Sequence, residues 1–118
     1  MDYFDEANHC YNVKEYEKAL KFYKKAIENK TYEACSYYNS AVCCIKLKEY
    51  QRGIELLKSA ISLKVDSKYF FNLAYCYAMI KNNKKALVYF NTAWSLDNND
   101  DECEKAINLI IKGLPKHP

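Results

Sequence analysis

Apolar residues along the chain recur every three or four positions, in segments divided by short polar stretches. The clearest segment is EYEKALKFYKKAIENK at residues 15–30, with near copies at residues 49–64 (EYQRGIELLKSAISLK) and 82–97 (NNKKALVYFNTAWSLD). This spacing places apolar side chains on one face of a helix. The segment before each copy has the same spacing. The pattern therefore predicts three pairs of helices, each pair joined by a short turn.

Small side chains recur at fixed places in the three copies, which are offset by 34 and then 33 residues. They form three columns: Ala7, Ala41 and Ala74; Ala19, Gly53 and Ala86; and Ala26, Ala60 and Ala93. Small residues allow two helices to approach closely, while large neighbours fill the space beside them. One helix pair cannot bury both of its faces, so a repeat of this length predicts that the pairs stack.

The third copy carries the most complete motif, which reads Phe70-x2-Leu73-Ala74-x2-Tyr77, then Ala86-x3-Phe90, then Ala93. This order of small and large residues resembles the tetratricopeptide repeat. The resemblance implies an all-α fold, an α-solenoid of three helix-turn-helix repeats with a C-terminal capping helix, wound as a right-handed superhelix. The repeats are expected at about residues 2–33, 34–66 and 67–98 and the capping helix at about 99–113, in a single domain of residues 1–118.

The resemblance also implies a function. Tetratricopeptide repeats are non-catalytic scaffolds for protein–protein interaction, and their first helices line a concave groove that holds an extended peptide. Carried onto this chain, the groove positions hold aromatic, asparagine and lysine side chains: Phe4, Asn8, Tyr11, Asn12, Tyr38, Asn39, Lys46, Lys68, Phe71, Asn72 and Tyr75, with Val42 at a further groove-facing position. Asparagine matches the donor and acceptor of a peptide group, and aromatic rings are rigid anchors. The alternative for both residue types is packing against neighbouring helices.

Two other functions stay open at this point. Co-chaperones of the same family bind the acidic C-terminal peptides of heat-shock chaperones with a clamp of cationic and asparagine side chains. This chain keeps Asn8, Asn39 and Lys68 of that clamp but has Phe4 and Asn72 in place of two cations, and charge-assisted bonds supply much of such a clamp's strength. The other alternative is a structural module that forms a homodimer through its hydrophobic C-terminal helix.

Six cysteines and two histidines raise the question of a metal site, which their spacing argues against. The sequence has no Cys-x2-Cys pair, and the adjacent Cys43 and Cys44 point in different directions on a helix. The packed positions of the repeat hold Cys10, Cys43, Cys44 and Cys76, which are expected in the core, whereas Cys35 and Cys103 are expected to be accessible. No metal, cofactor or catalytic residue is predicted.

Charge and hydropathy restrict the partners further. The net charge is +3, the lysines are interleaved with glutamates, and Arg52 is the single arginine, so a nucleic-acid partner is not expected. Nothing in the sequence resembles a signal peptide, and no apolar run is long enough to span a membrane. Six cysteines without an export signal indicate a reducing compartment. We therefore expect a cytoplasmic protein with a protein or peptide partner.

Overall fold

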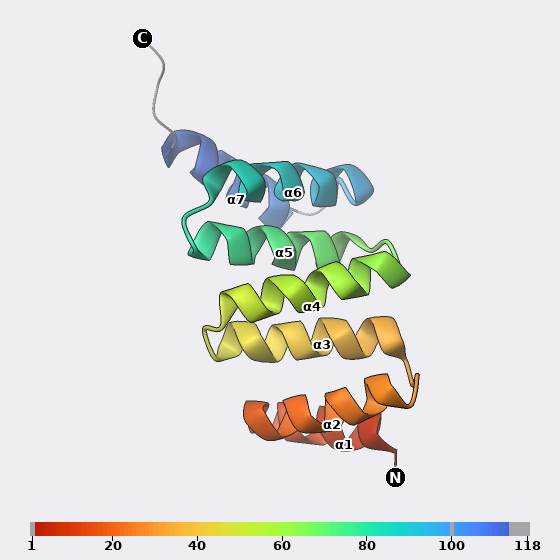
Figure 1. Cartoon of the computed structure of the whole chain (residues 1–118). Coiled ribbons are helices and arrows are strands. Elements are labelled where there is room, and N and C mark those ends of the chain that lie inside the picture. The colour runs from red at the N-terminus through yellow and green to blue at the C-terminus, as the bar shows by residue number, and fades with distance from the viewer. Residues whose placement is uncertain (1, 100, 114–118) are drawn as a thin grey trace. The chain divides into compact units, whose positions relative to one another are not determined.

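The computed structural model describes residues 2–99 and 101–113 of the chain, and these residues form seven α-helices and no strand (Figure 1). The helices are, in chain order, α1 Tyr3–Asn12, α2 Tyr16–Glu28, α3 Glu33–Lys46, α4 Tyr50–Leu63, α5 Ser67–Met79, α6 Asn83–Leu96 and α7 Asp101–Gly113. None of these seven helices is both long and apolar enough to cross a lipid bilayer. The predicted helix pairs are thus α1/α2, α3/α4 and α5/α6, followed by α7.

The helices belong to two compact units, residues 1–65 and residues 66–118. In the first unit each helix packs on the next, from α1 to α4, and in the second unit α5 packs on α6 and α6 on α7 (Figure 1). This succession of packed helix pairs confirms the predicted all-α solenoid of helical repeats. A single domain over residues 1–118 stays a prediction.

The small residues of the three columns lie where helices meet. All eight alanines among them have no exposed surface: Ala7, Ala19, Ala26, Ala41, Ala60, Ala74, Ala86 and Ala93. The one glycine of the columns, Gly53, is buried as well. Because none of these residues extends beyond Cβ, the helix backbones approach closely and larger side chains such as Ile54 and Leu57 fill the space between them.

The first and third repeats use the same aromatic contacts to join their two helices. Four ring pairs occupy equivalent positions: Tyr3–Phe22 with Phe70–Tyr89, and Phe4–Tyr23 with Phe71–Phe90. The first two pairs are stacked with ring centroids 6.3 Å apart in both repeats. The other two meet edge to face, at 6.0 and 5.2 Å. Both geometries are favourable for aromatic rings, so these pairs fix each first helix on its second helix.

The helix α7 packs on α6 with one apolar stripe. The stripe consists of residues three and four positions apart, with Cys103 fully buried and its neighbours half-buried: Cys103, Ala106, Ile107 and Ile110. Leu109 and Ile111 flank the stripe and are 71% and 53% exposed. The expectation that Cys103 is accessible is therefore wrong, because its side chain lies on the face that packs.

The three turns within the helix pairs share one backbone geometry. Lys14, Lys48 and Lys81 follow the C-caps of α1, α3 and α5, and each has a left-handed backbone with φ of 66°, 62° and 68°. At the middle turn the Lys48 N–H donates to the Ile45 carbonyl at 3.0 Å, and the Glu49 N–H donates to the Cys44 carbonyl at 2.8 Å. This is the Schellman arrangement, which most often has glycine at the left-handed position.

We predict that Lys48→Gly stabilises the protein by about 0.5–1 kcal/mol. A left-handed backbone costs a residue with a Cβ about 1–2 kcal/mol, and glycine avoids this cost while adding a smaller entropy to the unfolded chain. Urea denaturation followed by circular dichroism measures the difference. The control is Lys21→Gly, at an exposed position inside α2, which should lose about 1 kcal/mol. A loss of stability in Lys48→Gly would contradict the argument.

Candidate functional site

A pocket of about 340 Å³ opens in the first unit between α1 and α3. Its lining comes from three helices: Asn8, Tyr11 and Asn12 on α1, Tyr23 on α2, and Tyr38, Asn39 and Val42 on α3. We call it the amide pocket. The α1 and α3 residues are spaced one, three or four positions apart, so each set lies on one face of its helix. Six of the predicted groove positions, Val42 included, thus meet at one site.

One hydrogen-bond network joins the three helices at the base of the amide pocket. The Tyr23 hydroxyl donates to the Asn8 Oδ1 atom at 2.5 Å, and the Asn39 Nδ2 atom donates to the same oxygen at 3.4 Å. Tyr23 is 1% exposed, and burial raises the pKa of its phenol well above its usual range. Tyr23 therefore stays protonated and holds Asn8 in position.

No acidic, lysine, arginine or histidine side chain belongs to the lining of the amide pocket. Its lining consists of three side-chain amides, three phenols and one valine. An amide presents both a donor and an acceptor, and a phenol does the same from one oxygen. The lining can therefore form hydrogen bonds with neutral groups such as a peptide N–H or C=O.

The other predicted residues of the first unit lie outside the pocket lining. Phe4 packs on Tyr23 and on Tyr32, with ring centroids 6.0 and 4.9 Å apart. Lys46 is exposed at the last residue of α3. The ring of Phe4 is half-buried between these aromatic neighbours, so the packing alternative accounts for it.

The predicted residues of the second unit all lie on α5. Phe71 packs edge to face on Phe90 at 5.2 Å, as Phe4 does on Tyr23. The Asn72 Nδ2 atom donates to the Lys68 carbonyl at 2.9 Å, within the helix. Tyr75 is 36% exposed. These side chains form one face of α5, in the second unit, whereas the amide pocket belongs to the first unit.

Tyr23 is absent from the set of residues predicted from the sequence. It occupies the position that is Leu57 in the second repeat and Phe90 in the third, which the motif assigns to packing between helices. The signal that distinguishes it is the hydroxyl group. A buried phenol needs a hydrogen-bond partner, and the nearest polar residues on the neighbouring first helices are the asparagines.

The cysteines fall mostly where the repeat predicts them. Cys10, Cys43, Cys44 and Cys76 are buried in the core, as predicted, and Cys35 is exposed. Among the described residues no three histidine, cysteine or acidic side chains come together as metal ligands would. Burial raises the pKa of Cys43 from 9.0 to about 12, with Cys44 as a second cause, and burial raises the pKa of Cys44 from 9.0 to about 11.

Comparison with known proteins identifies the class to which this repeat solenoid belongs. The family model of the tetratricopeptide repeat matches residues 36–64 and 67–100, together more than half of the chain. The chain belongs to the tetratricopeptide repeat family, a family of protein-interaction scaffolds that are generally non-catalytic. No curated protein matches the sequence.

Several solved structures share the fold. YrrB, described as a tetratricopeptide repeat protein with an unusual peptide-binding site, is 26% identical with a TM-score of 0.84, over 92% of this chain and 57% of that one. The first such domain of Spaghetti (RPAP3), bound to the HSP90 peptide SRMEEVD, is 16% identical with a TM-score of 0.90, over 94% and 89% of the two chains. The Yersinia enterocolitica chaperone SycD, in complex with a peptide of the translocator YopD, is 15% identical with a TM-score of 0.89, over 94% and 91%.

The raised thiol pKa values predict a loss of stability in alkali. The unfolded chain releases these protons at lower pH than the folded chain, so the free energy of unfolding falls as the pH rises above 9.0 toward the folded values. Wild type should have a larger free energy of unfolding than Cys43→Ala. We expect this difference to shrink by on the order of 2 kcal/mol between about pH 8 and pH 11.

Urea denaturation under reducing conditions at several pH values measures this difference. Cys35→Ala, which removes an exposed thiol, is the matched control and should follow wild type at every pH. A constant gap between wild type and Cys43→Ala across the range would contradict the prediction.

Proposed function

We propose that the amide pocket binds an extended segment of a partner protein, in the manner of a peptide-binding scaffold. The observation that carries this proposal is the neutral lining of amides and phenols on α1, α2 and α3. A peptide backbone presents alternating N–H and C=O groups, and each can pair with an amide or phenol without desolvating a charge. Three tyrosine rings and Val42 add apolar surface for a side chain of the ligand.

The related structures support a ligand of this kind. YrrB is described as having a peptide-binding site, and RPAP3 and SycD are each described with a bound peptide. The chain spans 57% of the YrrB chain. Peptide binding is therefore inferred for the repeat scaffold that the two chains share, and not for a whole protein. A few hydrogen bonds of about 0.5–1.5 kcal/mol each, set against the ordering of a flexible peptide, favour a dissociation constant on the order of micromolar.

The carboxylate clamp is less well supported. A clamp needs cations around the carboxylate of its ligand, and the amide pocket has none in its lining. Lys46 lies at the end of α3 outside the lining, and Lys68 belongs to the second unit. Binding through neutral groups should therefore survive amidation of the peptide's C-terminus.

The dimer alternative depends on an apolar surface of α7 that is free for a second copy. The apolar stripe of α7 packs on α6, and the two exposed apolar side chains, Leu109 and Ile111, lie on either side of it. A monomeric scaffold is therefore the proposal.

The proposed compartment of the protein is the cytoplasm, because the buried thiols contribute to apolar packing in their reduced form.

The test uses a displayed library of random peptides selected against wild type, followed by fluorescence anisotropy with the enriched peptides in amidated form. We expect Asn39→Ala and Asn12→Ala each to weaken binding by about tenfold, the loss of one or two hydrogen bonds. Asn8 is left intact because Tyr23 and Asn39 both donate to it. Asn91→Ala, an exposed position on α6, is the matched control.

Binding that is unchanged in both pocket variants would refute the site. Asn72→Ala tests α5 independently, and weakening by that variant alone would move the proposed site to the second unit. Loss of binding on C-terminal amidation is not expected, whereas binding that requires a free carboxylate and weakens with salt would favour the clamp.

A further inference from the structure

A second and larger concavity, of about 570 Å³, lies on the first unit and is lined by α2, α3 and α4. We call it the outer groove. From α3 it uses Tyr37 and Ser40, whereas the amide pocket uses Tyr38, Asn39 and Val42. At roughly 100° per residue, these two sets are centred about 180° apart around the helix. The outer groove and the amide pocket therefore lie on opposite faces of α3.

The floor of the outer groove is apolar. It is formed by Leu20 and Ile27 of α2 and by Leu56 of α4. Leu20 is almost fully buried, and Ile27 and Leu56 are half-buried. The half-buried side chains expose apolar surface within a concavity, which is the arrangement that accepts an apolar side chain of a partner.

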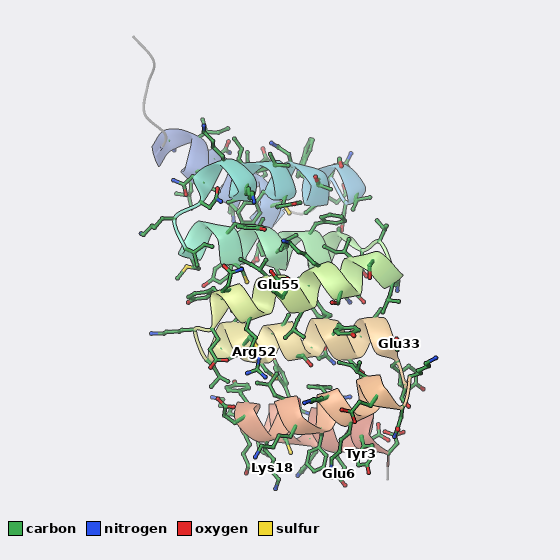
Figure 2. All side chains as sticks on the ribbon, viewed as in Figure 1. Tyr3, Glu6, Lys18, Glu33, Arg52 and Glu55 are labelled. Carbon is green, nitrogen blue, oxygen red and sulfur yellow. The ribbon has the colours of Figure 1, made fainter. Side chains whose placement is uncertain are left out.

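The rim of the outer groove carries three basic and two acidic side chains, so its net charge is positive by one. The basic residues are Lys21 and Lys24 of α2 and Arg52 of α4, the last of which is labelled in Figure 2. Glu17 and Glu28 are the first and last α2 residues of the lining, so the two lysines lie between them. Neither Lys21 nor Lys24 forms an ion pair within the described part of the chain.

Arg52 has one carboxylate partner, but that pair is weak. Its Nη1 atom lies 3.2 Å from the Glu49 Oε2 atom, one helical turn away, and both side chains are about half exposed. Exposed pairs of this kind contribute little to stability. Arg52 can therefore turn to a carboxylate of a partner, together with Lys21 and Lys24.

The length of the outer groove sets the form of its ligand. The α2 lining runs from Glu17 to Glu28, which corresponds to roughly 16 Å at about 1.5 Å per residue. Three turns of a partner helix have this length, and they present apolar side chains at positions one, four or five, and eight as anchors. We infer that the outer groove binds an amphipathic helix of a partner protein, with aliphatic anchors flanked by aspartate and glutamate.

The chain itself does not supply such a helix from α7. The exposed face of α7 is polar, with Glu104, Lys105, Asn108 and Lys112 along it. Leu109 and Ile111 lie on opposite sides of that face rather than in one stripe. The α7 helix of a second copy therefore lacks the apolar stripe that the outer groove would receive, and we take the occupant to be a different protein.

The experiment uses a displayed library of random 16-residue peptides, selected on wild type and counter-selected on the Lys21→Glu/Lys24→Glu variant. We expect enriched sequences with aliphatic residues three and four apart and an excess of acidic residues. Their synthetic peptides should bind wild type at least about tenfold more tightly than the variant, and should weaken as salt screens the lysines. The Asn39→Ala variant, altered only in the amide pocket, should bind them as wild type does.

The matched control is Lys84→Glu/Lys105→Glu, which makes the same change of net charge at exposed positions of α6 and α7. This control should bind the peptides like wild type, and a loss equal to that of the groove variant would overturn the inference. No enrichment over the counter-selection, enrichment of basic or proline-rich extended sequences, or binding lost in Asn39→Ala but kept in the groove variant would also overturn it. Leu56→Gln provides a second groove variant that leaves the charge unchanged, and it too should weaken binding.

Sedimentation velocity adds the remaining outcome. A dimer that forms with increasing concentration and is lost in Lys21→Glu/Lys24→Glu would identify a second copy as the occupant and would overturn the inference. A monomer in both proteins supports a foreign helix.

Discussion

The close approach of helices at alanine is the constraint on which the rest of this structure depends. The alanines of the three columns have no exposed surface, so any larger side chain there would push two backbones apart. Protein interiors are packed at the density of organic crystals, so one additional methylene group lowers the stability of the fold. Where two helices approach closely, some side chains of the first helix are held against the second helix and the others point away from it. The amide pocket and the outer groove of the first unit follow from this separation of side chains.

The aromatic residues show why a repeat motif predicts a fold more readily than a site. A ring at a groove-facing position can serve both ligand binding and helix packing, because one edge can contact a ligand while the other packs on the neighbouring helix. In this chain Phe4 and Phe71 make the same edge-to-face contact in the first and third repeats. The contact therefore helps to hold the first helix on the second helix in both repeats.

The helix pairs, the stacking of the first two pairs and most of the core could be predicted from the sequence, since all three follow from apolar spacing and from the alanine columns. The motif gives no information about contacts that occur in one repeat alone. The hydroxyl of Tyr23 is such a case, because the equivalent residues Leu57 and Phe90 have none. The left-handed lysines of the turns are another, since glycine is the usual residue there and Lys48 carries no signal of the geometry.

Cys103 illustrates a third limit of sequence reasoning. Its place near the start of the last helix suggests exposure, but the face on which it lies packs against α6 and leaves it fully buried. Helix periodicity specifies which residues share a face, and only the packed neighbour specifies which face is covered. The same limit applies to the groove residues, whose exposure depends on contacts between repeats.

The two faces of α3 differ in the chemistry they offer, and this difference would separate the two ligands proposed for them. The amide pocket has a neutral lining of amides and phenols, and the outer groove has an apolar floor with a basic rim. Neutral hydrogen bonds depend little on ionic strength, whereas the attraction of exposed lysines for carboxylates is screened by salt. A ligand suited to one face is therefore poorly suited to the other, because an acidic helix would leave its charges unpaired in the amide pocket. In the two proposals one short helix, with residues on both faces, would serve two partners that do not compete for the same groups.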